Sequence, residues 1–240
     1  MERAKVTAII LSGGKGTRLN SDIPKQYIKV KDRAVITYSL EVFADHPDID
    51  SFVIVAADEW QEFILEEMRQ SGIPVGKFLG FAEPGENRQL SVYNALEKVI
   101  EATHDDELNV KAVMIHDAAR PCISSDLITR LIEAYDGFDG VMPASPMNNT
   151  MYVSSDGKSI TGLLERGHIF AGHTPEMFDL KNYYEANKAL LPDKIKTING
   201  SSEPAVMAGM KIAMIENDEA NFKITTNADL ERFRTLIEKK

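Results

Sequence analysis

Short apolar runs alternate with helix-length segments along most of this chain. The runs expected to form strands are residues 6–11, 52–57, 77–81 and 113–116. The segments with helical spacing that follow them are 35–43, 59–70, 89–102 and about 125–135. Strands that are apolar almost throughout, each followed by a helix, are typical of a parallel sheet covered on both faces. The pattern therefore predicts an α/β fold with a doubly wound, mostly parallel sheet.

The stretch from residue 140 to about 170 breaks this alternation. Pro143, Pro146 and two asparagines interrupt short β-like pieces, and a turn signal stands at 154–157. We predict a protruding β-arm here, built as a hairpin, instead of another strand and helix pair. The later elements expected are a helix near 180–190, strands at 211–216 and 222–225, and a helix at 227–240. Because no Gly-, Pro- or Ser-rich linker separates two halves, residues 1–240 are predicted to form a single domain with an arm.

Composition narrows the choice of partners. The 240 residues include 37 Asp plus Glu against 27 Lys plus Arg, a formal charge of −10. An acidic surface repels nucleic acid, and no apolar run approaches the roughly 18 residues that cross a bilayer. We therefore expect no nucleic-acid partner and no membrane association. The lone Cys122 cannot form an internal disulfide and the first residues do not form a signal sequence, so the cytoplasm is the expected compartment.

A glycine-rich segment follows the first predicted strand. It reads Leu11-Ser12-Gly13-Gly14-Lys15-Gly16-Thr17-Arg18-Leu19, with Pro24-Lys25-Gln26-Tyr27 shortly after. Glycines let main-chain N–H groups converge on an anion, and Lys15, Arg18 and Lys25 add positive charge. The spacing matches neither the Walker motif nor the dinucleotide fingerprint, which disfavours a P-loop ATPase and a dehydrogenase. A pocket for a triphosphate is the favoured interpretation, and a solvated basic turn is the alternative.

These segments resemble the signature of sugar-nucleotide and polyol-nucleotide pyrophosphorylases. Further segments narrow the resemblance to the 2-C-methyl-D-erythritol 4-phosphate cytidylyltransferase family, to which ribitol-5-phosphate cytidylyltransferases also belong. They begin at Arg88, His116, His173 and Phe222 and read RQLSV, HDAARP, HTPEMF and FKITTNADL. The resemblance runs in order over essentially the whole chain. It implies a Rossmann-like nucleotidyltransferase fold.

The resemblance also implies a reaction and a set of nucleotide-binding residues. A phosphate monoester oxygen would attack the α-phosphorus of CTP, release pyrophosphate and leave a CDP-polyol. Such a transfer depends on alignment and charge neutralisation, tasks that the resemblance gives to Arg18, Lys25 and Lys223. The residues it places at the nucleotide are Leu11, Ser12, Gly13, Gly14, Lys15, Gly16, Gly85, Arg88, Ser91 and Ala118. Without it, Lys223 would be interpreted as a surface lysine and Arg88 as an exposed residue at a helix start.

Asp117 follows the predicted strand 113–116, and open parallel sheets place ligands at the carboxyl ends of their strands. A carboxylate there can hold Mg²⁺ that bridges the triphosphate. Position alone favours an ordinary turn residue. The match of the surrounding segment to the family favours the metal ligand, so we expect Mg²⁺ as cofactor.

The acceptor side departs from the family pattern. Asn149 stands where the family usually has an Asp, and Ser201-Ser202-Glu203 stands where it has a Thr-Asp pair. Both differences remove a carboxylate, and Asn donates hydrogen bonds that Asp cannot. The acceptor-binding residues implied by the resemblance are Arg120, Thr150, Arg166, Thr174 and Ser201. Arg166 would reach the acceptor phosphate across a homodimer interface made by the arm, whereas Arg120 could bind phosphate or brace its loop.

The predicted function is a cytidylyltransferase that joins CTP to a small polyol phosphate. The first expected acceptor is 2-C-methyl-D-erythritol 4-phosphate and the next is D-ribitol 5-phosphate. Two alternatives stay open: a nucleotidyltransferase with another nucleotide, sugar or polyol phosphate, and a non-catalytic CTP-binding regulator, which the missing carboxylates suggest.

Overall fold

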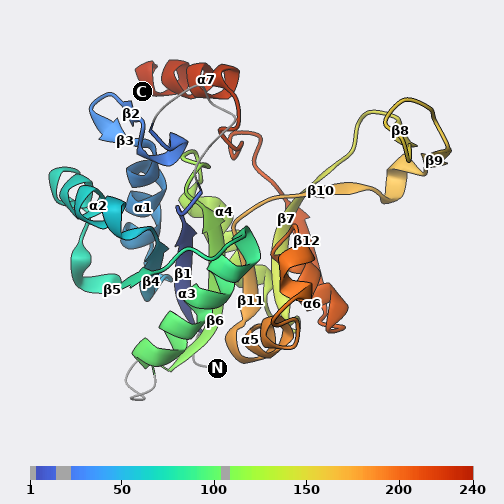
Figure 1. Cartoon of the computed structure of the whole chain (residues 1–240). Helices are drawn as coiled ribbons and strands as arrows, with labels where there is room; N and C mark the ends of the chain where they lie inside the picture. Colours follow the sequence, from blue (N-terminus) through green and yellow to red (C-terminus); the bar gives the residue numbers. More distant parts are fainter. Residues whose placement is uncertain (1–3, 15–22, 104–108, 240) are drawn as a thin grey trace.

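The computed structural model describes residues 4–14, 23–103 and 109–239, which form a central eight-stranded sheet flanked by helices (Figure 1). The strand order is β10-β7-β11-β6-β1-β4-β5, and β12 also pairs with β7. The strands are β1 (Lys5–Leu11), β4 (Ser51–Val55), β5 (Phe78–Ala82), β6 (Val110–Asp117), β7 (Gly140–Pro146), β10 (Phe170–Gly172), β11 (Glu176–Asp179) and β12 (Ile212–Glu216). The pairs β1·β4, β1·β6, β4·β5 and β7·β12 are parallel. Strand β10 pairs antiparallel with β7, and β11 pairs antiparallel with β6 and β7. The predicted α/β fold with a mostly parallel sheet is confirmed.

Helices cover both faces of the sheet because successive strand residues point to opposite sides. Ala8 and Ile10 of β1 pack with α1 (Val35–Asp45), α2 (Asp58–Gln70) and α4 (Ser125–Ala134). Ile9, between them, packs on the other face with α3 (Arg88–Thr103) and α5 (Leu180–Lys188). The two apolar clusters on either side of β1 make the fold doubly wound, as the continuous apolar strands predicted.

Polar side chains fix where several helices begin. The Ser124 hydroxyl accepts a hydrogen bond from the Leu127 amide (3.0 Å) at the start of α4. Thr226 and Asp229 form a reciprocal capping box at the start of α7 (Asn227–Glu238).

A small hairpin, β2 (Lys29–Val30) with β3 (Arg33–Ala34), was not predicted. It contributes Val30 to an apolar cluster with residues of α7.

The arm is shorter than predicted because Gly140–Pro146 belongs to the central sheet as β7. Glycine at 140 permits this close pairing, since a Cβ there would lie 2.7 Å from the Met177 carbonyl oxygen of β11. Pro143 lacks an N–H but still takes part through its carbonyl, which accepts from the His173 amide (2.8 Å). The arm itself carries the hairpin β8 (Met151–Val153) and β9 (Gly162–Leu164), which projects away from the sheet (Figure 1).

Two elements were not predicted, and one predicted strand is not formed. Strand β11 and the short helix α6 (Ser202–Met207) were not expected. Residues 222–225 do not form the predicted strand; Ile224 is fully buried and its amide donates to the Ala119 carbonyl (2.8 Å). This hydrogen bond ties the segment to the loop after β6. Among the helices in the described ranges, none combines the length and apolar character that spanning a membrane requires.

Candidate active site

A cavity of about 410 Å³ opens where β1 and β6 end. Its described lining residues are Leu11, Gly13, Gly14, Lys25, Gln26, Gly85, Glu86, Asn87, Arg88, Ser91, Asp117, Ala119, Lys223 and Thr225. The carboxyl edge of a parallel sheet is the expected ligand position in such folds. The lining joins segments from both ends of the chain.

The described part of the glycine-rich loop is held by its neighbours. The buried Ser12 hydroxyl donates to the Val55 carbonyl at the end of β4 (2.6 Å). The Gln26 side-chain amide donates to the carbonyls of Ser12 (2.5 Å) and Gly14 (2.8 Å). These bonds fix the described part of the backbone at the cavity wall. The predicted contacts of Lys15, Gly16 and Arg18 lie outside the described residues and stay predictions.

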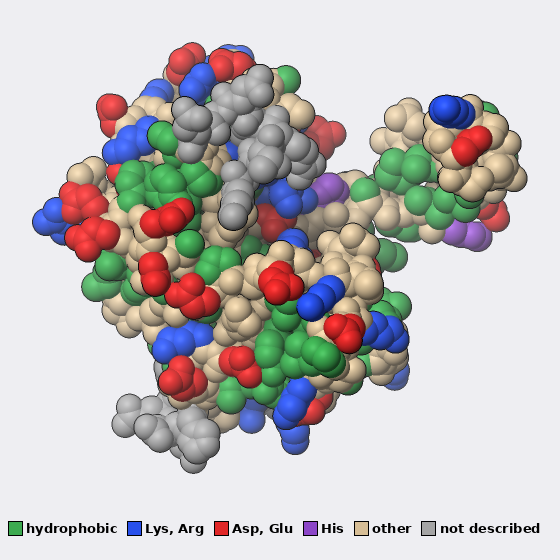
Figure 2. Space-filling model, viewed as in Figure 1, with side chains coloured by type: hydrophobic (Ala, Val, Ile, Leu, Met, Phe, Trp, Pro, Cys, Tyr) green, Lys and Arg blue, Asp and Glu red, His purple; other side chains and the backbone are tan. Residues whose placement is uncertain are grey.

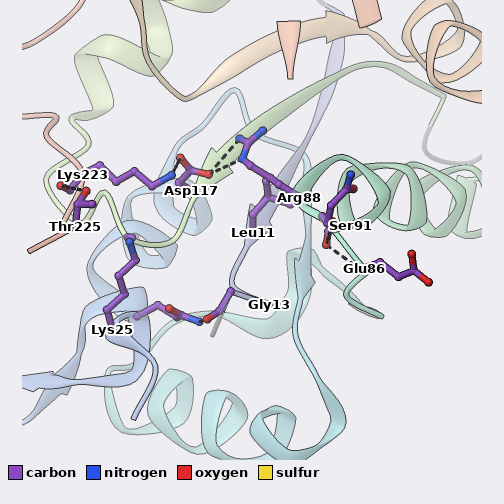
Figure 3. Close-up of a pocket in the computed structure, with 14 residues that line it drawn as sticks. Leu11, Gly13, Lys25, Glu86, Arg88, Ser91, Asp117, Lys223 and Thr225 are labelled. Carbon is purple, nitrogen blue, oxygen red and sulfur yellow. Dashed lines mark hydrogen bonds and ion pairs between the residues drawn. The ribbon is translucent and has the colours of Figure 1, made fainter. Parts of the chain in front are cut away.

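Asp117 is the anionic centre of the cavity (Figure 3). Its Oδ1 accepts from Arg88 Nε (3.1 Å), and its Oδ2 accepts from Lys223 Nζ (2.8 Å). Arg120 Nε lies 3.8 Å from the same Oδ2. Burial opposes ionisation of Asp117, but Arg88 and Lys223 outweigh it and hold the pKa of the carboxyl well below its usual range. The carboxylate is therefore charged at neutral pH.

Lys25 and Lys223 reach the same space, although 198 positions separate them in the sequence. Lys25 Nζ donates to the carbonyl of Ile224, the residue that follows Lys223 (2.7 Å). Figure 3 shows Lys25 pointing into the cavity below the Lys223–Asp117 pair. The structure thus places two of the three predicted catalytic cations in one cavity wall. An anion entering it meets positive charge in a chain that is acidic as a whole.

The segment before α3 forms another part of the wall. The Gly85 amide donates to the Ser91 hydroxyl (3.0 Å), which donates to the Asn87 carbonyl (2.9 Å). The Asn87 side chain accepts from the Leu90 amide (2.8 Å) at the helix start. Gly85, Arg88 and Ser91 all line the cavity, as the resemblance implied. Ser91 also has a structural task, because it ties the segment to its helix.

Gly85→Ala is expected to raise the KM for CTP about tenfold or more, because small displacements in a binding site weaken positioning strongly. An added Cβ would lie 2.3 Å from the Leu90 Cβ and 2.9 Å from the Ser91 amide nitrogen, so the segment must move off α3. Steady-state pyrophosphate release against CTP concentration measures the change. Gly76→Ala is the control, since nothing lies within 4 Å of a Cβ there. Equal KM values for the two variants would contradict the placement of the segment at the nucleotide.

A second cavity of about 430 Å³ adjoins the first. Its described lining residues are Arg88, Asp117, Arg120, Met142, Phe170, Gly172, His173, Thr174, Glu176, Asn199, Gly200, Ser201, Ser202 and Lys223. The two cavities share Arg88, Asp117 and Lys223 as a common wall. A reacting phosphate from each side could therefore meet the same charged groups.

Three of the predicted acceptor residues line this second cavity. The Thr174 hydroxyl accepts from the Asp117 amide (3.1 Å), and Arg88 Nη1 donates to the Ser201 hydroxyl (2.5 Å). Arg120 Nη1 donates to the Asn221 carbonyl (2.9 Å). Arg120 thus braces the loop before Lys223 and also faces the cavity, so the two roles considered for it are compatible.

Several predicted residues lie away from both described linings. Thr150 and Arg166 are exposed on the arm, where the Arg166 guanidinium donates to the Asn148 carbonyl (2.9 Å). Ala118 is fully buried and its amide donates to the Leu11 carbonyl (3.0 Å), while its neighbour Ala119 lines the cavity. Ser12 is buried behind the loop. Within one chain these residues support the site or stand apart from it.

Sequence reasoning missed other lining residues. Asn87 and Thr225 lie beside the predicted Arg88 and Lys223, so adjacency could have found them. His173 and Glu176 flank Thr174 within a segment that resembles the family, but only their shared cavity reveals them. Glu176 supplies a carboxylate to a region from which the sequence had suggested that carboxylates were lost.

The sheet and the charged cavity at its carboxyl edge define an α/β protein built to bind phosphorylated ligands. The chain belongs to the 2-C-methyl-D-erythritol 4-phosphate cytidylyltransferase (IspD) family, whose model matches residues 6–239. This confirms the resemblance inferred from the motifs.

Individual relatives cover the chain almost completely. The 2-C-methyl-D-erythritol 4-phosphate cytidylyltransferase of Lachnospira eligens is 30% identical over 94% of this chain and 96% of its own. The ribitol-5-phosphate cytidylyltransferase of Lacticaseibacillus paracasei is 25% identical over 98% and 99%. The bifunctional enzyme IspD/IspF of Wolbachia pipientis is 32% identical over 99% of this chain, which spans 57% of the length of that relative.

A solved structure agrees with the fold. The 4-diphosphocytidyl-2C-methyl-D-erythritol synthase of Anaerococcus prevotii superimposes with a TM-score of 0.81 at 20% identity, over 98% of this chain and 96% of that one. At this identity the likeness supports the shared fold alone.

Proposed function

We propose that this chain is a cytidylyltransferase that joins CTP to a small polyol phosphate and releases pyrophosphate. The observation that carries the proposal is the convergence of Lys25, Arg88 and Lys223, from three distant segments, around one cavity at the carboxyl edge of the sheet. Its continuity with a second polar cavity provides room for an acceptor. The family match supports the choice of CTP.

The reaction divides between the two cavities. The triphosphate lies along the glycine-rich loop and Lys25, and the acceptor phosphate approaches from the second cavity past the shared wall. An acceptor phosphate oxygen forms a bond to the α-phosphorus of CTP, while the bond from that phosphorus to the β-phosphate bridging oxygen breaks. The electron pair leaves with pyrophosphate. Lys223 and Lys25 stabilise the negative charge that develops on the transferred and leaving phosphates.

We propose that Mg²⁺ accompanies the triphosphate and that Asp117 holds it. A carboxylate has about four lone-pair sites, so the bonds from Arg88 and Lys223 leave acceptor capacity on Asp117. Magnesium is commonly bound by one or two carboxylates together with substrate phosphates, which fits a single ionised Asp in a cavity for a triphosphate. When bound, the ion would neutralise charge on the phosphates. Arg88 and Lys223 keep the Asp117 carboxylate ionised and oriented for this task.

The acceptor proposed first is 2-C-methyl-D-erythritol 4-phosphate, and D-ribitol 5-phosphate is second. Relatives named for each of these substrates match nearly the whole chain, with the higher identity for the first. The test incubates the protein with each of the four NTPs, inorganic pyrophosphatase and a panel of polyol and sugar phosphates, and measures phosphate release. We expect release with CTP and a polyol phosphate. Thermal stabilisation by CTP without release for any acceptor would favour the non-catalytic regulator instead.

We also propose that the arm makes a homodimer. Hydrophobic side chains gather on the arm, apart from the mixed charges of the main body (Figure 2). Tyr152 is 56% exposed and Leu163 is 66% exposed, although such residues are usually covered. A second copy would cover them and could bring its Arg166 to the acceptor cavity.

Leu163→Asp is therefore expected to shift the protein from dimer to monomer, because a charge buried in an apolar interface is costly. Size-exclusion chromatography with light scattering measures the mass. Val75→Asp, at a similarly exposed apolar position off the arm (62%), should leave the mass unchanged. A monomeric wild type, or a dimeric Leu163 variant, would contradict the proposed interface.

A further inference from the structure

Glu176 is a buried carboxylate in the wall of the second cavity. It opens strand β11 and pairs in register with Ile115 of β6, two positions before Asp117. Only 5% of its surface is exposed, yet it lines the cavity together with Ser201 and Ser202. A carboxylate this buried carries a desolvation penalty unless polar or charged groups around it compensate.

Its hydrogen bonds leave room for a ligand. Ser201 and Ser202 line the same cavity wall as Glu176, and their hydroxyls favour the charged form of its carboxylate and so lower its pKa. Ser201 accepts from Arg88 Nη1 (2.5 Å), so its own proton is available for Glu176. Even two serine hydroxyls would use only part of the four or so lone-pair sites of a carboxylate. The remaining sites can accept hydrogen bonds from hydroxyl groups in the cavity.

The charges around Glu176 give the cavity two unlike ends. Burial raises the pKa of Glu176, and Arg88 opposes that rise by favouring the charged form. Arg120 and Lys223 line the same cavity and supply positive charge, next to the shared wall with the nucleotide cavity. A phosphate is attracted to these cations and repelled by a carboxylate. A bound molecule with one phosphate and an uncharged hydroxylated tail would therefore point its phosphate to the cations and its tail to Glu176.

We propose that Glu176, beside the predicted acceptor residue Ser201, is a further specificity-determining residue that binds hydroxyl groups of the acceptor's polyol chain. This rests on the proposed function, because it assumes that the second cavity holds the acceptor. The substrate class is a polyol monophosphate whose tail carries hydroxyls and no second anion. A tail with a carboxylate or a second phosphate would meet the charge of Glu176 and be rejected.

The test replaces the carboxylate by its isostere. Glu176→Gln keeps the size and loses the charge, and a hydrogen bond to a charged group corresponds to about tenfold to 100-fold in affinity. We expect the KM for the polyol phosphate to rise by that factor while the KM for CTP changes less than about twofold. Glu216→Gln on the exposed face of β12 is the matched control and should leave both constants unchanged. Melting temperatures verify that the variants are folded.

A second readout separates substrate contact from a structural role. The wild type and Glu176→Gln are compared on the polyol phosphate that is turned over best and on analogues that each lack one hydroxyl. Discrimination is the ratio of kcat/KM for the full substrate to kcat/KM for an analogue. If Glu176 binds a hydroxyl, the wild type discriminates against the analogue that lacks it, and this ratio is at least about tenfold smaller in the variant. If Glu176 only balanced Arg88, the KM for CTP would rise together with that for the acceptor, and discrimination among analogues would persist.

Failure of the Glu176 assignment and failure of the proposed function would give different results. An active wild type whose Glu176→Gln variant keeps its acceptor KM and its discrimination overturns the assignment of Glu176 and leaves the proposed function standing. A wild type that turns over no polyol phosphate with any NTP overturns the proposed function, and the assignment of Glu176 falls with it.

Discussion

Lys223→Met is expected to lower kcat with CTP and the polyol phosphate by about 10²- to 10³-fold, the size of effect seen when one preorganised group at a developing charge is lost. Lys223 lines both cavities and its Nζ lies 2.8 Å from Asp117. It is therefore placed where the two phosphates would meet. Methionine keeps much of the length and apolar stem of the side chain but removes the charge.

The substitution should leave the fold largely intact, because Asp117 keeps its contacts with Arg88 and Arg120. Single-turnover pyrophosphate release at saturating substrates measures the chemical step, and thermal unfolding measures stability. Lys211→Met, at an exposed lysine just before β12, controls for the loss of a positive charge from an acidic protein. Near-normal turnover of Lys223→Met would remove this residue from the catalytic group.

The parts of the fold that sequence could predict are those governed by local pattern. Strands β1, β4 and β6 are apolar almost throughout, and the Ser124 cap marks the start of α4 at about the predicted residue. Strand β7 escaped prediction because its prolines suggested a break, whereas pairing on both sides stabilises it. Residues 222–225 have strand-like composition but connect through the Ile224 amide to a loop, so local preference was overridden by tertiary packing.

In the candidate site, too, some residues could be predicted from local sequence, whereas others are brought together only by the fold. Residues close together in the sequence, such as Gly13, Gly14 and Lys25, could be proposed from spacing and charge. The resemblance placed Asp117 and Lys223 separately at the nucleotide, but their pairing, across 106 positions, was not predicted and depends on the folded chain. Glu176 had no local signal because a single acid after a proline is common in loops. Its proposed role depends on its position in the cavity that it lines with Ser201.

Asp117→Asn is expected to have the second large effect, on both activity and stability. The carboxylate compensates Arg88, Lys223 and, at longer range, Arg120, so its loss leaves positive groups facing one another. Removing one partner of a buried ion pair costs about 3–5 kcal/mol of unfolding free energy, which urea unfolding at pH 7 would measure. We expect kcat to fall about 100-fold or more, since the positions of two cations and the proposed magnesium ligand change together. If Asp117 holds the ion, the variant also needs more Mg²⁺ for half-maximal activity.

The pH dependence of stability distinguishes loss of this charge from a general defect. The pKa of Asp117 is lower in the folded chain than in the unfolded one, where Asp titrates near 3.9, so folding is stabilised by the charged form. That contribution is fully present above about pH 4 and is lost as the pH falls towards the folded-state pKa. The unfolding free energy of the wild type should thus decrease more steeply below about pH 4 than that of Asp117→Asn, which has no such proton to take up. Asp136→Asn, at an exposed carboxylate, should follow the wild type. Parallel acid profiles for Asp117→Asn and the wild type would show that the cations around Asp117 do not stabilise its charge, and the electrostatic basis of the site would fail with that result.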